Sequence, residues 1–152
     1  VENVNASTAP KKYGAWNLNC NLNNEQKQIC FLSQQINNTE KDKETEILAM
    51  YHIGYFNSDQ SKKELKLIEV LPPNVQIPAG TAINSGEKNI APGIYINCTI
   101  NSCQAIATIT QDDIEMILSN DNYLEFITAD GKQAKITFIK HGLKEGLKVL
   151  ER

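Results

Sequence analysis

The sequence predicts a mainly β fold: a single-domain sandwich or partly closed barrel with one or two short helices and two hairpin disulfides. Short runs of alternating apolar residues recur along the 152 residues, separated by polar or Pro- and Gly-containing turns. Four cysteines form two close pairs, each bracketing a short polar segment between two such runs. This length suits one domain that can bury a substantial core without a metal or cofactor.

The N-terminal part predicts a flexible arm followed by a hairpin. Residues 1–12 are polar and lack periodicity, so the expected division is an arm at 1–12 and an exported β-rich domain at 13–152. Trp16, Leu18 and Cys20 alternate with polar residues, as on a half-buried strand. A polar turn and a second strand at 28–36 would place Cys30 opposite Cys20, where cross-strand Cβ atoms approach to about 4.5–5.5 Å.

The middle of the chain predicts further strands separated by polar loops. The expected strands are 47–56, 65–71, a short one at Val75 and Ile77, 94–98 and 103–109. Gly54 suggests a bulge in the first of these, and Pro72-Pro73 ends the second because proline cannot donate to a ladder. A four-residue turn containing Asn101, a residue type that tolerates the left-handed conformation, would place Cys98 opposite Cys103.

The C-terminal part predicts two helices around one hairpin. Thr110 is a candidate N-cap for a helix at 111–119, and we assign Asp112 and Asp113 to its first turn rather than to metal binding. The helix carries an apolar stripe of Ile114, Ile117 and Leu118.

Strands at 123–128 and 132–139 flank Asp130-Gly131, which is typical of a two-residue hairpin turn. Leu143, Leu147 and Leu150 then recur at helical spacing within 142–150, despite Gly146.

The cysteine spacing favours disulfides and an oxidising compartment. No C-x-x-C redox motif is present, and nine and four intervening residues differ from the usual zinc knuckles. Four-thiolate zinc binding and free thiols remain the alternatives. Of the three pairings open to four cysteines, Cys20–Cys30 with Cys98–Cys103 closes the shortest loops and is the one we predict. These residues are the only site residues that the sequence assigns.

Charge argues against some partners. The net charge is −3, the pI is near 5.4 and Arg152 is the only arginine, which disfavours a nucleic-acid partner. No apolar run approaches the roughly 18 residues that span a bilayer. For an exported protein that begins at Val1, we expect the signal peptide to have been removed.

No catalytic motif accompanies the two histidines, His52 and His141. The sequence lacks a G-x-S-x-G elbow, an H-E-x-x-H helix and a Walker phosphate loop. We therefore expect structural histidines and assign no catalytic, cofactor-binding or metal residue. The aromatic residues Tyr51, Tyr55 and Phe56 form either a binding surface or part of the core, and core packing is the favoured interpretation.

Five segments together resemble the invasion-associated locus B protein family of exported bacterial proteins. They are Y-G-A-W-N-L-N-C, I-C-F-L, L-P-P-N-V-Q-I-P-A-G, C-T-I-N-S-C-Q-A and the closing G-L-K-E-G-L-K-V-L. Ser102 departs from the family, which often has glycine there, so the turn type stays open. The resemblance implies an exported β-rich protein, and the founding member is associated with invasion of host cells. It supplies no established catalytic residues.

Two functional hypotheses follow. The first is a non-enzymatic exported envelope or secreted protein, located in the periplasm, on the cell surface or outside the cell. It would contribute to virulence by binding a host or envelope protein through loops held by the stapled hairpins. The second is a periplasmic hydrolase whose site is assembled from residues distant in sequence. A polar pocket containing His52 or His141 would favour the hydrolase, and a flat apolar surface the binding protein.

Overall fold

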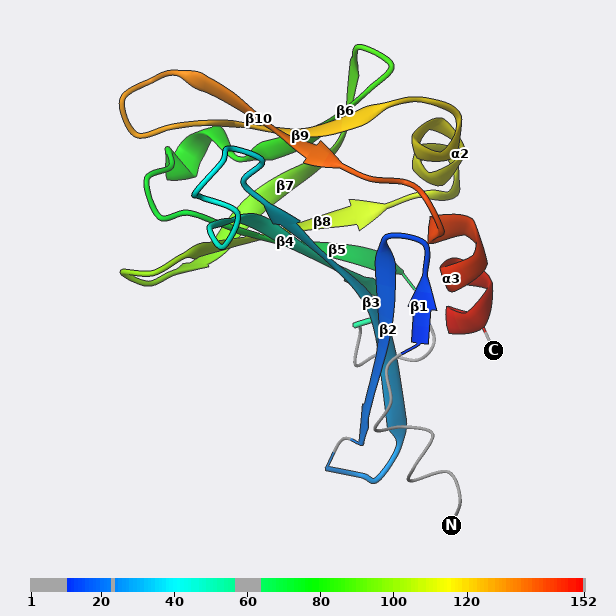
Figure 1. Cartoon of the computed structure of the whole chain (residues 1–152). Helices are drawn as coiled ribbons and strands as arrows, with labels where there is room; N and C mark the ends of the chain where they lie inside the picture. The colour runs from blue at the N-terminus through cyan, green and yellow to red at the C-terminus, as the bar shows by residue number, and fades with distance from the viewer. Residues whose placement is uncertain (1–10, 23, 57–63, 152) are drawn as a thin grey trace.

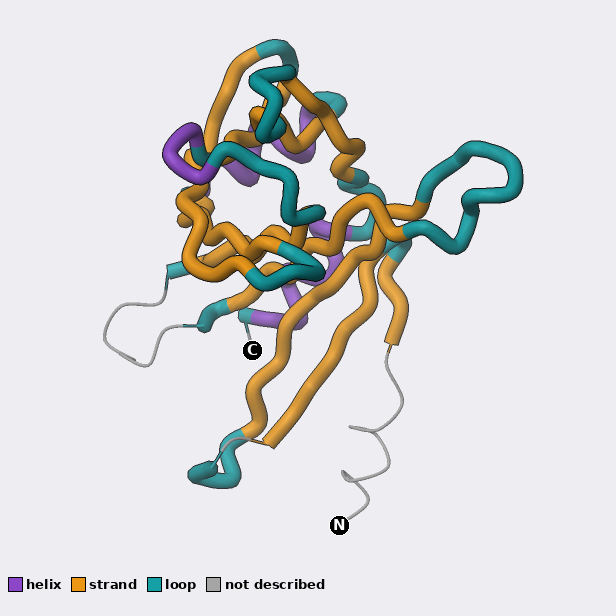
Figure 2. Tube along the Cα trace, turned by 90° about the vertical axis from the view of Figure 1, so that its left-hand side faces the viewer, coloured by secondary structure: helices purple, strands orange, loops and turns teal. Residues whose placement is uncertain are grey.

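A computed structural model describes residues 11–22, 24–56 and 64–151. Ten strands form one antiparallel sheet in the order β1-β2-β3-β4-β5-β8-β7-β6-β9-β10 (Figure 1). Within the described residues, β1 and β10 are the two edges and do not pair with each other. The sheet is therefore open, and it curls on itself as a partly closed barrel (Figure 2). The predicted mainly β fold is confirmed.

The elements follow the chain in a mostly hairpin-by-hairpin order. The strands are β1 (Lys11–Tyr13), β2 (Trp16–Leu22), β3 (Gln28–Asn37), β4 (Ile47–Gly54), β5 (Leu65–Leu71), β6 (Thr81–Ser85), β7 (Lys88–Cys98), β8 (Cys103–Ile109), β9 (Asn122–Ile127) and β10 (Gln133–Phe138). The helices are the 3-10 turn η1 (Ile77–Ala79), α2 (Gln111–Ser119) and α3 (Leu143–Leu150). Lys11 and Lys12, which the sequence placed in the N-terminal arm, lie in β1, and residues 1–10 of that arm are outside the described residues.

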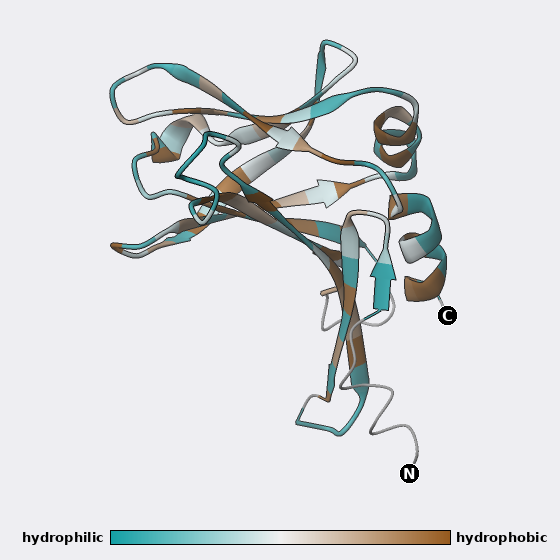
Figure 3. Cartoon of the chain, viewed as in Figure 1, coloured by the Kyte–Doolittle hydropathy of each residue, from teal (hydrophilic) through white to brown (hydrophobic). Residues whose placement is uncertain are grey.

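The inner face of the curled sheet holds the core. The largest fully buried apolar side chains are Trp16, Leu32, Tyr51, Ile53, Leu67, Leu71, Ile83, Ile117, Leu124 and Leu143. Figure 3 shows the brown, hydrophobic segments of the central strands, whereas the loops are largely teal. The predicted core role of Tyr51 is confirmed. Burial of these side chains is the main stabilising contribution to such a fold.

Side chains, rather than a backbone ladder, connect the open side of the sheet. The Gln34 amide donates to the Ile139 carbonyl at 2.9 Å, and its Oε1 accepts from the Ile139 N–H at 3.0 Å. Trp16 Nε1 also donates to Ile139 O at 2.9 Å, and the Tyr51 hydroxyl donates to Thr137 O at 2.9 Å. Residues from β2, β3 and β4 thus satisfy backbone groups at the end of β10.

The turn before α3 crosses the β1–β2 turn at very short range. The Ala15 N–H donates to the His141 carbonyl at 2.9 Å. Gly14 and Gly142 have φ of +58° and +86°, and a Cβ on Gly142 would lie 2.0 Å from the Tyr13 carbonyl oxygen. Only glycine accommodates both the left-handed conformation and this approach.

The helices agree closely with the sequence. Thr110 caps α2 in a capping box, in which its hydroxyl accepts from the Asp113 N–H and the Asp113 carboxylate accepts from the Thr110 N–H. The predicted helix at 111–119 is confirmed, as is the C-terminal helix, although Gly142 is its N-cap. Gly146 faces the core, where a Cβ would lie 2.8 Å from the Leu32 methyl groups.

The strand prediction is wrong at β6 and at the start of β7. The sequence placed no strand at β6 and began β7 at Ile94, whereas β7 begins at Lys88. The β6–β7 register shifts between Thr81 and Ile83, and Ala91 in the facing strand has φ of +50°. This irregularity breaks the apolar alternation on which strand prediction depends.

The predicted bulge at Gly54 is also wrong. Gly54 makes no bulge, because it pairs in register with Phe31 and Lys66, and the bulge in this hairpin lies between Ile36 and Asn37. Glycine is needed at position 54 for packing, since a Cβ there would lie 3.0 Å from the Phe31 Cβ.

The turn at Asp130-Gly131 is longer than the predicted two-residue type. The Thr128 N–H donates to the Lys132 carbonyl at 2.8 Å, and only Gly131 of this turn has a positive φ, +85°. A three-residue turn that ends in a left-handed glycine has this geometry. The short strand expected at Val75 and Ile77 is a single bridge from Val75 to Thr128, followed by η1.

The hydrogen bonds of Gln34 generate a stability prediction. We expect Gln34→Ala to lower the free energy of unfolding by roughly 2–3 kcal/mol, because the Ile139 N–H loses its partner and a cavity opens. Gln35→Ala is the matched control: Gln35 is exposed and bonds only Asn37 among the described contacts, so a change within about 0.5 kcal/mol is expected. Urea unfolding measures both, and equal losses would contradict a closing role for Gln34.

Candidate functional site

Two hairpins carry the disulfides, and both predicted pairings are confirmed. Cys20 lies directly opposite Cys30, with a Cα–Cα distance of 4.1 Å, at the outer end of the β2–β3 hairpin. Cys98 lies opposite Cys103, with a Cα–Cα distance of 4.0 Å, at the outer end of the β7–β8 hairpin. Figure 1 shows both hairpins extending from the body of the sheet, and each disulfide joins the two strands near the end of its hairpin. The loops beyond them are thus presented on rigid supports.

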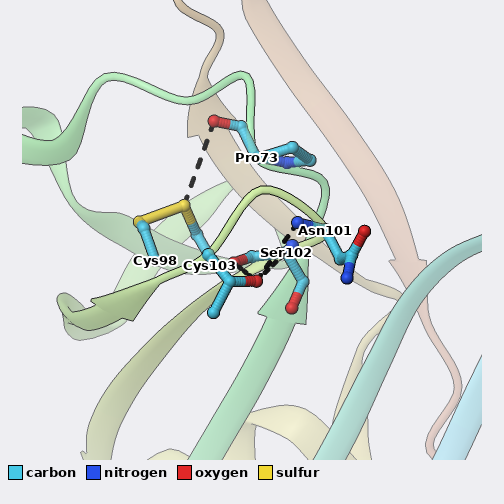
Figure 4. The surroundings of a disulfide bond; sticks show 6 residues. Pro73, Cys98, Asn101, Ser102 and Cys103 are labelled. Atoms are coloured by element: carbon cyan, nitrogen blue, oxygen red, sulfur yellow. Dashed lines mark hydrogen bonds between the residues drawn. A yellow bond between two sulfur atoms is a disulfide. The ribbon is translucent and has the colours of Figure 1, made fainter.

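The Cys98–Cys103 disulfide is anchored to the protein on one side. Cys103 is 1% exposed, and its Sγ lies 3.9 Å from the Pro73 carbonyl oxygen, as the dashed line in Figure 4 shows. A disulfide sulfur carries no hydrogen, so this is a packing contact. The turn beyond it contains Asn101, which has no positive φ and does not adopt the left-handed conformation considered from the sequence.

The ends of the two hairpins differ in chemistry. The β2–β3 end combines exposed Leu22 and Ile29, 70% and 40% exposed, with an ion pair between Glu25 and Lys27 at 3.9 Å. The β7–β8 end exposes apolar side chains, and residues 89–111 contain no charged side chain. One end thus combines apolar and charged side chains, whereas the other combines apolar side chains with the exposed but uncharged Asn97, Thr99 and Asn101.

His52 lies half-buried on the outer face of β4. It pairs in register with Ser33 and Ile68, and its ring meets the Phe31 ring edge-on at a centroid distance of 5.5 Å. Desolvation by burial lowers the pKa of His52, so the imidazole is neutral at pH 7. The Ser33 hydroxyl accepts from Asn19 Nδ2 at 2.8 Å. A mainly apolar environment surrounds this histidine.

His141 has a backbone role. Its carbonyl holds the Ala15 N–H, while its side chain is exposed in the turn before α3. The two histidines therefore lie on different elements, one on the outer face of the sheet and one beside the β1–β2 turn. Of the aromatic trio, Tyr51 is in the core, Tyr55 packs partly against it, and Phe56 contacts Phe31 at a centroid distance of 5.9 Å.

A buried carboxylate is the functional candidate that sequence analysis missed. Glu69 is 0% exposed on the inner face of β5, where Tyr51 is its partner on β4. The Thr81 hydroxyl donates to Glu69 Oε1 at 2.5 Å, whereas Oε2 and the buried Tyr95 hydroxyl make no hydrogen bond. A Cβ on Gly93 would lie 2.2 Å from Thr81 Oγ1, so glycine leaves room for this contact.

The sequence contains a signal for this burial. In β5 the inward positions are Leu65, Leu67, Glu69 and Leu71, so the alternation itself points Glu69 into the core. Burial raises the pKa of Glu69 to about 7, against the lowering effect of the Thr81 hydrogen bond. Burial, and then the charge of Glu69, raise the pKa of Tyr95 to about 12.

A groove of about 500 Å³ lies on the outer face between β7, β8 and the start of α2. Its lining includes the apolar side chains of Pro92, Ile94 and Ile106. It also includes Lys66 and Asp113, which carry opposite charges. Lys66 Nζ donates to the Thr108 hydroxyl at 2.7 Å. The groove adds apolar surface next to the β7–β8 hairpin and contains no histidine.

Within residues 11–22, 24–56 and 64–151, no three His, Cys, Asp or Glu side chains gather as metal ligands would. No helix in the same ranges combines the length and apolar character needed to cross a membrane.

Comparison with known proteins gives the family. Residues 16–151 match the family described as Invasion associated locus B (IalB) protein. The chain belongs to the IalB family. No curated protein matches it. The crystal structure of invasion associated protein b from Bartonella henselae is similar, with a TM-score of 0.78 and 16% sequence identity, covering 94% of this chain and 95% of that one. At this identity the likeness shows a shared fold.

Membership in the IalB family confirms the resemblance seen in the sequence. The match spans the described β2 to α3 and therefore includes both stapled hairpins and Glu69. IalB membership and the two disulfides are consistent with export from the cytoplasm.

Glu69 generates a pH prediction. Its folded pKa, about 7, lies above the ordinary 4.5 of the unfolded chain, so the folded state binds more protons between these values. The contribution of Glu69 to stability is fully present below about pH 4.5 and is lost as the pH rises through 7. Its size is roughly 3 kcal/mol.

We expect Glu69→Gln to keep the acceptor for Thr81 and to remove this loss. The variant should match the parent near pH 4.5 and exceed its unfolding free energy by roughly 1–3 kcal/mol at pH 8. Denaturant unfolding across this range measures the difference. Glu115→Gln, on the exposed face of α2, is the control and should follow the parent. Parallel profiles for Glu69→Gln and the parent would refute the assignment.

Proposed function

We propose that this IalB-family chain is a non-enzymatic exported protein of the bacterial envelope or surroundings, which contributes to host-cell invasion by binding a protein. The periplasm, the cell surface and the extracellular space are its candidate locations, and a host or envelope protein is its candidate partner. The observation that carries the proposal is the β2–β3 hairpin, whose disulfide holds an apolar and charged end away from the body of the sheet (Figure 1).

The β2–β3 end has the composition of a protein contact. Protein interfaces combine apolar and polar side chains, and here Leu22 and Ile29 supply apolar area on the two opposite faces of the hairpin, beside Glu25 and Lys27. The Cys20–Cys30 staple restrains both strands before binding, so less conformational entropy is lost on association. Rigid scaffolds commonly display functional loops in this way.

The hydrolase alternative receives less support from the geometry. His52 of β4 pairs in register with Ser33 of β3, and this is the one feature that favours the hydrolase alternative. The Ser33 hydroxyl is engaged by Asn19, and the His52 ring packs on Phe31. An activated nucleophile needs its base within hydrogen-bond reach and a third group that orients the base. The surroundings of His52 suit packing on an apolar face better than proton transfer.

A cell-binding experiment tests the proposal. Labelled parent protein should bind cultured mammalian cells with a saturable component, and trypsin treatment of the cells should abolish that component because the partner is a protein. The double variant Leu22→Ser, Ile29→Ser should weaken the saturable component roughly tenfold or more, since it loses the exposed apolar side chains on both faces of this end. Ile100→Ser, on the other stapled hairpin, is the matched control and should retain binding to the trypsin-sensitive partner.

Thermal unfolding of all three proteins separates binding from folding. The substituted side chains are exposed, so the melting temperatures should be similar. Absence of a saturable, trypsin-sensitive component, or an equal component of this kind in the double variant, would each contradict a protein contact at the β2–β3 end.

A further inference from the structure

The end of the β7–β8 hairpin exposes isoleucines that the fold does not use. Ile94, Ile96 and Ile100 are 66%, 53% and 92% exposed, and none of them is part of the core. The hairpin projects from one side of the sheet, and its end is brown in Figure 3. Exposed Asn97 and Thr99 lie between Ile96 and Ile100 in the sequence. Large apolar side chains exposed together on a projection are typical of a surface that meets another apolar phase or partner.

Beyond Lys88, the first residue of β7, this hairpin is also free of charge. Residues 89–111, which include most of β7 and all of β8, contain no Asp, Glu, Lys or Arg, although 22% of the whole chain is charged. Moving an ionised side chain out of water is costly, and this segment has none to move. The β2–β3 end would incur that cost, because it carries the charged Glu25 and Lys27.

The polar backbone of the turn is already paired. The Thr99 N–H donates to the Ser102 carbonyl at 2.8 Å, and Thr99 Oγ1 lies 3.1 and 3.2 Å from the N–H groups of Asn101 and Ser102, which donate to it. Figure 4 shows this compact turn beside the disulfide. Backbone groups that leave water are costly unless they are hydrogen-bonded, and these bonds lower that cost for the N–H groups of Thr99, Asn101 and Ser102.

We infer that the end of the β7–β8 hairpin inserts its isoleucines into the interface of a lipid surface. The Cys98–Cys103 disulfide and the contact of Cys103 with Pro73 hold the turn in shape, so insertion needs little ordering. The missing charges favour a lipid surface, because an ionised side chain is costly to move out of water, whereas the uncharged Asn97, Thr99 and Asn101 can stay at the level of the hydrated headgroups. Since residues 89–111 contain no cation, insertion does not depend on anionic lipid or on salt, and zwitterionic lipid suffices.

The test uses the full chain and phosphatidylcholine vesicles. The parent should float with the vesicles to the same extent at low and high salt. Ile100→Asn and Ile96→Asn should each weaken binding, and the double variant should weaken it by roughly tenfold or more. Leu22→Asn is the matched control, because it removes an apolar side chain that is 70% exposed on the other stapled hairpin, and it should bind as the parent does.

A fluorescence measurement reports insertion directly. Ile100→Trp places an indole at the apex, while the native Trp16 is fully buried and supplies a constant background. Vesicles should shift the emission of the variant to shorter wavelength and leave that of the parent unchanged. Circular dichroism and melting temperatures, similar in all variants, would show that each protein is folded.

Several results would overturn the inference. They are failure of the folded parent to bind vesicles, equal losses in the Leu22→Asn and Ile100→Asn variants, or an unchanged emission of Ile100→Trp. Binding to cells that depends on Ile100 but is abolished by trypsin would show that a protein occupies the hairpin instead. Loss of trypsin-sensitive binding in the β2–β3 variant, by contrast, concerns the proposed function alone.

Discussion

The rest of the structure depends on one side-chain amide that acts as a substitute for a strand. Gln34 of β3 exchanges two hydrogen bonds with the backbone of Ile139, just beyond β10, and thereby links two parts of the sheet that no ladder joins. An open, curled sheet would otherwise leave these backbone groups unpaired, which is costly when they are removed from water. Trp16 and Tyr51 reinforce the same seam from β2 and β4.

Burial on the inner face of the sheet explains the raised pKa of Glu69. Beside Tyr51 and the close approach of Gly93, this carboxylate on β5 has Thr81 as its one hydrogen-bond donor among the described residues. A buried acid of this kind costs stability at neutral pH, so its place in the core is a compromise between packing and charge. Its chemistry faces inward, whereas the surfaces available to partners lie on the hairpins.

The two disulfides have a different physical role, which is to restrain the ends of the hairpins. Hairpin ends that leave the sheet have few packing contacts, and a cross-strand disulfide restrains them without any additional core. The same device supports two ends with different surfaces, one containing Glu25 and Lys27 and the other containing Ile96 and Ile100. A shared support with divergent surfaces fits a binding protein, in which specificity is located in the loops while the scaffold stays constant.

Local signals in the sequence determined the features that depend on near neighbours. These include both cysteine pairs, the Thr110 cap of α2 and the regular alternation of Leu65–Leu71, because hairpin, capping and strand periodicities act over a few residues. Only the tertiary structure decided how β10 meets Gln34, how the irregular β6–β7 pairing proceeds and what surrounds Glu69. Those features are set by residues far apart in the chain, whose contacts no local periodicity encodes.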